Sequence, residues 1–151
     1  NKPVGYVCSR DGQGSKTIYD LLPQELHHLK TIGRLDKYSS GLLLLTNDGM
    51  LTNKLTHPSY QKNKIYQVIL GKPLTPHDKT AIENGIMLDD GVSHLKLHGN
   101  SKNWTVTMHE GRNRQIRRTF SAIGNVVTSL HRTHFGPYTL GTLGSAKYLE
   151  V

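Results

Sequence analysis

One aspartate in this 151-residue chain has the neighbours expected of a reactive group. Asp36 lies in the segment GRLDKYSSGLLLLTNDG (residues 33–49), between the basic residue Arg34 and a run of four leucines. A carboxylate at the mouth of a buried strand could act as a nucleophile, or as an acid or base. Such a group has to stay ionised in a partly desolvated site, so a fixed cation must offset the effect of burial. Our candidate for that cation is Arg117, and the alternative role for Asp36 is a helix cap or a structural salt bridge.

A second group of residues has the chemistry of a phosphate-binding surface. The segment EGRNRQIRR spans residues 110–118, and a helix over 113–123 would turn Ile116, Phe120 and Ile123 toward the core. The opposite side would carry guanidinium groups, each of which presents a planar fork of donors to a phosphate. A solvated helix face is the alternative. The residues expected on this basic surface are Arg34, Arg112, Arg114, Arg117 and Arg118, with His131, Arg132 and His134 extending it.

The triplet Lys64-Ile65-Tyr66 is the third candidate. On a strand, Lys64 and Tyr66 would point to one face while Ile65 points into the core. A cation beside an aromatic ring suits a nucleobase that must be stacked next to its phosphate. The alternative is that Tyr66 only packs, as most tyrosines in strands do.

The elements that position these residues follow from apolar periodicity and turn residues. Strands and helices are mixed without regular alternation, which favours an α+β fold with a largely antiparallel sheet, flanking helices and a central catalytic cleft. At this length we expect one domain over 1–151, or two subdomains around one cleft. Expected strands cover 4–9, 42–46, 65–70, 93–98, 104–109, 126–135 and a last segment near Tyr148; expected helices cover 17–22, a segment with Leu51 and Leu55 capped by Asn47 or Asp48, 75–85 and 113–123.

The composition limits the classes of partner and cofactor that we expect for this chain. Lys and Arg outnumber Asp and Glu by 19 to 11, and the net charge of +8 favours a polyanion. The single cysteine, Cys8, cannot form an internal disulfide, so a reducing compartment such as the cytoplasm is expected. No apolar run reaches membrane-spanning length, and no membrane partner is expected. The nine histidines show no metal-ligand spacing, so we expect neither a metal nor another cofactor.

Taken together, the motifs resemble those of the RsuA/RluB/RluE/RluF family of ribosomal RNA pseudouridine synthases. The segment NKPVGYVC (1–8) resembles the opening motif of that family, and residues 33–49 resemble its catalytic motif. Residues 64–66 resemble its KxY motif and residues 110–118 its late arginine-rich motif. The four matches occur in the family's order and cover essentially the whole chain.

The resemblance assigns roles to individual residues. It implies that Asp36 is the essential aspartate, that Tyr66 stacks on the target base, and that Arg117 pairs with the aspartate. It also implies that Ile116 helps to wall the pocket. Ser39 stands where threonine is common in the family, a change that keeps the hydroxyl group.

The implied activity is the conversion of one uridine in ribosomal RNA to pseudouridine, by a monomer that flips the base out and needs no cofactor. On the resemblance alone, 23S RNA is favoured over 16S RNA. Many family members carry an S4-like N-terminal domain that this chain lacks, either because it was removed or because this member is of a shorter type. The alternatives are a non-catalytic RNA-binding module on the same scaffold and a glycoside hydrolase, which would need two carboxylates across a cleft. The target nucleotide, and whether Asp36 attacks ribose, attacks the base or acts as a base, are left open.

Overall fold

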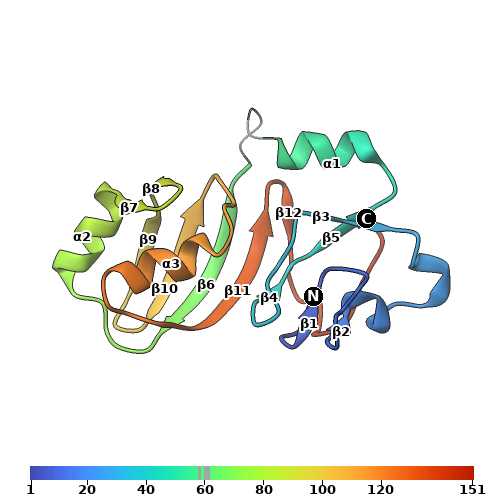
Figure 1. The fold of residues 1–151 in the computed structure, drawn as a ribbon, viewed down its shortest axis with the longest axis horizontal. Helices are drawn as coiled ribbons and strands as arrows, with labels where there is room; N and C mark the ends of the chain where they lie inside the picture. The colour runs from blue at the N-terminus through green and yellow to red at the C-terminus, as the bar shows by residue number, and fades with distance from the viewer. Residues whose placement is uncertain (58, 60–61) are drawn as a thin grey trace.

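A six-stranded sheet forms the centre of the computed structural model, which describes residues 1–57, 59 and 62–151. The spatial order is β12, β11, β6, β10 and β9, all antiparallel, and β4 joins β11 in parallel (Figure 1). This mixed, largely antiparallel sheet confirms the expected α+β class. The strands are β4 (Ser40–Gly41), β6 (Lys64–Leu70), β9 (Lys96–Asn100), β10 (Asn103–Met108), β11 (Val127–Phe135) and β12 (Tyr138–Thr139).

Three two-stranded sheets surround the central one. β1 pairs with β2 in parallel, whereas β3–β5 and β7–β8 are antiparallel pairs. Two short 3-10 helices follow β2: the first lies within the helix predicted over 17–22, and the second lies beyond it. The bounds are β1 (Tyr6–Val7), β2 (Lys16–Thr17), β3 (Lys30–Ile32), β5 (Leu44–Thr46), β7 (Ile86–Leu88) and β8 (Gly91–Ser93), with η1 (Ile18–Leu21) and η2 (Gln24–Leu26).

The helices begin and end where local chemistry predicts. Of the two possible caps of α1 (Gly49–Thr56), Asp48 is the one used, and its carboxylate accepts backbone N–H groups of the first turn. α2 (Pro76–Asn84) starts after the Thr75 cap with proline at its first position, and it ends at Gly85. No helix in the described part of the chain is long and apolar enough to cross a membrane.

α3 (Gln115–Ala122) covers one face of the central sheet (Figure 1). As expected, Ile116 and Phe120 face the core, with exposed fractions of 4% and 0%. Ile123 follows the last turn and is partly buried against the same cluster. A second, smaller apolar cluster lies around β3, α1 and the end of β11, so among the described residues β11 contributes to two apolar clusters.

The expectation for the faces of β6 was wrong. Tyr66, Val68 and Leu70 are the buried side chains, whereas Ile69 is 44% exposed and Ile65 is only partly buried. The strand alternates with period two, as predicted, but α3 covers the face that carries Tyr66. The position of the covering helix therefore decides which side of the strand is inside, and apolar Ile69 is left on the open side.

Two further expectations about strands were wrong. The run 42–46 is not one fully buried strand: β4 pairs with β11, β5 pairs with β3, and the chain crosses between two sheets at the leucines. Gly41 permits this crossing, because it has a positive φ of 110° and any side chain there would collide with the carbonyl oxygen of Arg132. The segment near Tyr148 forms no strand, and that ring is 53% exposed.

Candidate catalytic site

Asp36 lies in the loop between β3 and β4, with its side chain 35% exposed. Its Oδ2 is 3.3 Å from Nη1 of Arg114. Arg114 stands just before α3, where it adopts a left-handed backbone with φ of 51° and ψ of 32°. The ion pair therefore joins the catalytic-motif loop to the start of a helix 78 residues further along the chain.

Lys2 holds the Asp36 loop from behind. It is 3% exposed, and its Nζ donates to the carbonyl oxygens of Asp36 at 3.0 Å and Ser39 at 2.7 Å. The same Nζ also donates to the carbonyl oxygens of Pro3 at 3.0 Å and Lys37 at 3.4 Å. Burial lowers the pKa of Lys2, while the nearby Cys8 and Asp36 oppose that effect. Sequence reasoning included Lys2 in the opening motif but gave it no role; the signal was its place in that motif, two residues before the expected strand over 4–9.

Arg117 contacts the loop backbone and forms no ion pair with Asp36. Its Nη2 donates to the carbonyl of Tyr38 at 3.2 Å and to Oγ of Ser39 at 3.4 Å, and its Nη1 donates to the carbonyl of Val127 at 3.2 Å. Burial lowers the pKa of Arg117, the charge of Arg114 lowers it further, and Asp36 raises it. Arg117 is thus close enough to interact electrostatically with both members of the ion pair, but Arg114 makes the contact that the sequence analysis gave to Arg117.

Lys64 lies against the end of β11. Its Nζ is 5.1 Å from the ring centre of Phe135, and the guanidinium carbon of Arg132 is 4.9 Å from the same ring. Burial lowers the pKa of Lys64, and the charge of Arg132 adds to the effect. Lys64 also reaches the loop before α3, since a side chain at Gly111 would come within 2.6 Å of its Nζ.

Arg132 is 2% exposed and was wrongly expected on the basic surface. Its backbone lies opposite Tyr66 in the β11–β6 register, so both side chains lie on the face covered by α3. Its Nε donates to the carbonyl of Leu42 at 2.9 Å, at the point where the chain leaves β4. Arg132 therefore stabilises the framework behind the site.

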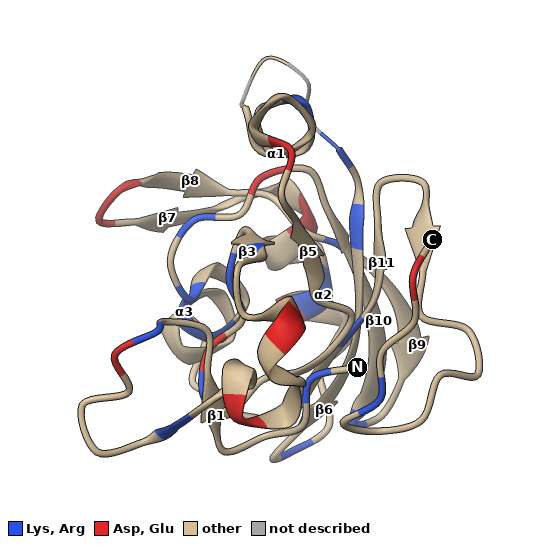
Figure 2. Ribbon diagram, turned by 90° about the vertical axis from the view of Figure 1, so that its right-hand side faces the viewer, with Lys and Arg blue, Asp and Glu red and all other residues tan. Residues whose placement is uncertain are grey.

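Arg112 and Arg118 are brought together at Asp90, away from Asp36. Both bind this carboxylate at the tip of the β7–β8 hairpin, with N–O distances of 2.8 to 3.0 Å. Figure 2 shows this acidic tip beside the basic segments of α3. Arg34, by contrast, is exposed and borders a hollow of about 550 Å³ formed mainly by the loop between β1 and β2. The roles of these arginines in RNA binding, and of Ile116 in a pocket wall, stay predictions.

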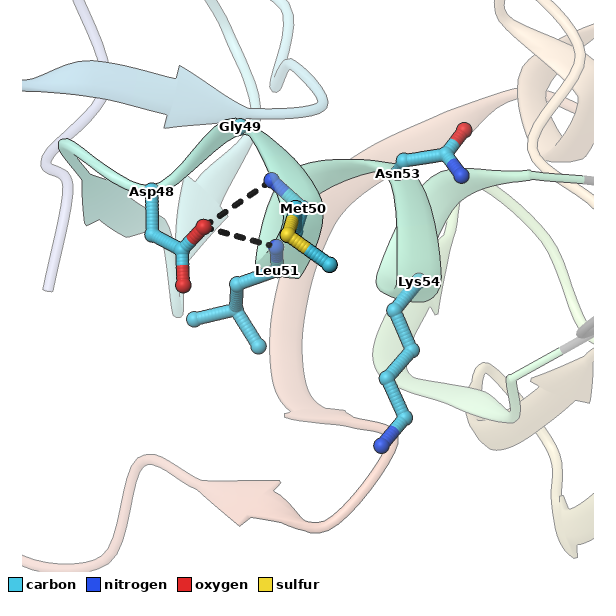
Figure 3. Close-up of a pocket in the computed structure, with 6 residues that line it drawn as sticks. All are labelled: Asp48, Gly49, Met50, Leu51, Asn53 and Lys54. Carbon is cyan, nitrogen blue, oxygen red and sulfur yellow. Dashed lines mark hydrogen bonds between the residues drawn. The ribbon is translucent and has the colours of Figure 1, made fainter.

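A hollow lies at the start of α1, and none of the predicted site residues lines it (Figure 3). It measures about 570 Å³ and is lined by Asp48, Gly49, Met50, Leu51, Asn53 and Lys54. Its carboxylate, from Asp48, is engaged by the N–H groups of Met50 and Leu51, so we interpret it as a helix cap. Within the described residues, no group of three or more His, Cys, Asp or Glu could hold a metal ion.

Comparison with known proteins places this arrangement in a family. A family model described as RNA pseudouridylate synthase matches residues 1–122, which include the Asp36 loop, Lys64, Tyr66 and the α3 arginines. The chain belongs to the RNA pseudouridylate synthase family. This membership confirms the resemblance inferred from the motifs.

Relatives in the family act on either ribosomal subunit according to their names. The chain is 39% identical to ribosomal large subunit pseudouridine synthase B of Pseudomonas aeruginosa, over 100% of this chain and 42% of that protein. It is 37% identical to ribosomal small subunit pseudouridine synthase A of Haemophilus influenzae, over 93% of this chain and 62% of that protein. A crystal structure of a pseudouridylate synthase superimposes with a TM-score of 0.90 at 36% identity, covering 97% of this chain and 66% of the other. The chain thus spans less than two thirds of the length of each.

Proposed function

We propose that this pseudouridylate synthase domain converts a uridine of ribosomal RNA into pseudouridine, with Asp36 as the essential carboxylate. The observation that carries the proposal is the way Asp36 is presented. Lys2 fixes its backbone from within, Arg117 fixes the following residues, and Arg114 holds the half-exposed carboxylate. A charged group prepositioned in this way needs no reorganisation when a substrate arrives. The names of the relatives supply the substrate class.

The reaction balances without a redox step. The bond between N1 of uracil and C1′ of ribose breaks, and C5 of the same uracil bonds to C1′. The proton lost from C5 is matched by one gained at N1. Asp36 serves either as a nucleophile or as a base. A stacked uridine cannot reach the loop, so it must be flipped out at a cost of a few kcal/mol.

Tyr66 is proposed to contact the flipped uracil. Because this ring is only 8% exposed, the uracil has to enter as far as the floor of the site under α3 to meet it. Tyr66 faces the same side of the sheet as Arg132, which lies opposite it on β11. The proposed pocket therefore has an aromatic floor, with Asp36 and its arginines near the rim.

Tritium release from ribosomal RNA labelled at C5 of uridine tests this function directly. We expect Asp36→Asn to abolish release while RNA binding is nearly unchanged, because the amide keeps the shape and loses the nucleophile. Asp78→Asn, on α2 at the other end of the molecule, is the matched control and should keep full activity (Figure 1). Equal release by the Asp36→Asn variant and the control would show that Asp36 is not the essential carboxylate. No release by the unsubstituted protein would instead favour a non-catalytic RNA-binding module.

The ribosomal subunit and the target nucleotide are a second part of the proposal. We favour large-subunit RNA, as the motifs first indicated, and we expect the protein to act as a monomer. Pseudouridine mapping of both ribosomal RNAs, from cells with and without the protein, identifies the target. A site lost only from small-subunit RNA would overturn the choice of subunit and leave the proposed chemistry intact.

A further inference from the structure

An exposed aromatic ring stands two residues after Asp36. Tyr38 has an exposed fraction of 66%, whereas Tyr66, the ring proposed for the flipped base, is buried. Ser39, the next residue, is 3% exposed. Tyr38 thus projects outward from a loop whose neighbouring residue is locked into the protein.

The backbone beneath Tyr38 is held at successive peptide groups. The carbonyl of Asp36 accepts from Ser39 N–H at 3.0 Å as well as from Lys2. The carbonyl of Lys37 accepts from Gly5 N–H at 2.7 Å. The carbonyl of Tyr38 itself accepts from Arg117. A ring on such a base loses little conformational freedom when it binds, which favours tight contact.

One cation lies beside the ring, and two more reach the same loop. The Nζ of Lys37 is 5.6 Å from the ring centre and donates to Oγ of Ser15 at 3.1 Å, which fixes its place. Arg117 and Arg114 come to the same loop from the start of α3. An aromatic ring set among cations matches single-stranded nucleic acid, whose bases stack while its phosphates are neutralised. An apolar protein partner would not be matched by so much charge.

We propose that Tyr38 is a stacking platform for an unpaired nucleobase next to the nucleotide that reaches Asp36. The proposal rests on the proposed function and adds a second, exposed base-binding position to the site. Tyr66 would hold the reacting base inside, and Tyr38 would hold its neighbour at the rim. Stacking requires no particular base, so Tyr38 contributes affinity and alignment more than sequence preference.

Paired RNA probes separate stacking from backbone contacts. We use a short uridine oligonucleotide and an abasic oligonucleotide of equal length and charge, and we measure their affinities for Asp36→Asn protein so that no turnover occurs. Adding Tyr38→Ala should weaken uridine binding at least about fivefold and leave abasic binding unchanged. Tyr38→Phe should bind like the parent. Tyr148→Ala, which removes a comparably exposed ring near the C-terminus, should change neither affinity.

Two outcomes overturn the proposal. One is an equal loss of affinity for both probes, which would mean that Tyr38 shapes the loop and does not stack. The other is no loss for either probe. The proposed function is tested separately, by tritium release from RNA incubated with the unsubstituted protein. A uridine-selective effect of Tyr38 without any release would leave the stacking inference standing and remove the enzymatic one.

Discussion

Two arginines serve Asp36 in different ways, although both come from the same segment. Arg114 contacts the carboxylate directly, and its own side chain is 50% exposed. Arg117 is more buried and donates to the backbone of the loop and of β11. An exposed ion pair contributes about 0–1 kcal/mol to stability, whereas hydrogen bonds from a charged group contribute about 1.5–3 kcal/mol. Arg114 is therefore placed to affect the charge at the Asp36 carboxylate, and Arg117 is placed to stabilise the folded loop.

Substituting each arginine by glutamine distinguishes a role in catalysis from a role in stability. Arg114→Gln should lower tritium release and leave the urea midpoint of unfolding nearly unchanged, because the ion pair is exposed. Arg117→Gln should lower release and also cost about 1–3 kcal/mol of stability, because its hydrogen bonds to Tyr38 and Val127 are weakened or removed. If Arg117→Gln were as stable as the parent while Arg114→Gln were not, our division of roles would be reversed.

Among the elements, the β7–β8 hairpin is attached to α3 through Asp90. Arg118 holds both carboxylate oxygens, and Arg112 bridges Asp90 to the carbonyl of Val92. These contacts of Arg112 and Arg118 with Asp90, here called the clamp, use two of the arginines that the sequence analysis had assigned to phosphates. It sets the position of the hairpin beside the residues that lead into α3 (Figure 2).

The clamp predicts a pH-dependent contribution to stability. Hydrogen bonds from Arg118 lower the pKa of Asp90 below its ordinary value of 3.8, and the charge of Arg112 adds to the effect. A carboxylate with a lowered pKa in the folded state stabilises the fold above its ordinary pKa, and this contribution is lost as the pH falls through the lowered value.

We expect Asp90→Asn to reduce the thermal midpoint at neutral pH, and the difference from the parent should shrink as the pH falls below about 3.8. Asp89→Asn is the matched control and should have a smaller effect at every pH, because the hydrogen bonds of Arg118 go to Asp90. A difference that persisted unchanged in acid would show that the charge of Asp90 is not what holds the hairpin.

For the whole molecule, the excess of positive charge is not all available to RNA. Of the 19 Lys and Arg residues, Arg112 and Arg118 are engaged by Asp90, and Lys79 is engaged by Glu83. Arg34 is exposed on the same loop as Asp36, and Lys37 lies within that loop. The cations that surround the candidate site should therefore carry the electrostatic part of RNA binding.

The dependence of RNA affinity on salt concentration tests which of these cations bind RNA phosphates. We expect Arg34→Gln and Lys37→Gln each to reduce the slope of log affinity against log salt by about one for each phosphate that the variant no longer binds. Lys79→Gln, whose cation is paired with Glu83 on α2, should leave the slope unchanged. Equal slopes for all four proteins, parent included, would place the RNA on another surface.

Local patterns in the sequence determined much of this protein. The bounds of α2 and the apolar stripe of α3 follow from contacts between residues a few positions apart. Local pattern also limited the cap of α1 to Asn47 or Asp48, and the structure uses Asp48. Asp36 was recognisable as a candidate because its motif is contiguous in the chain.

Only the tertiary structure decided which side of β6 is inside, because that depends on where α3 packs. It also decided which arginine meets Asp36. A helix pattern placed Arg114 and Arg117 alike on an exposed face, but the left-handed backbone at Arg114 turns its side chain to the carboxylate. The burial of Lys2 and Arg132 likewise results from pairing between segments far apart in the chain, since β4 meets β11 and Lys2 lies opposite Gly41. Such contacts depend on how whole elements pack together, and no local spacing of residues specifies them.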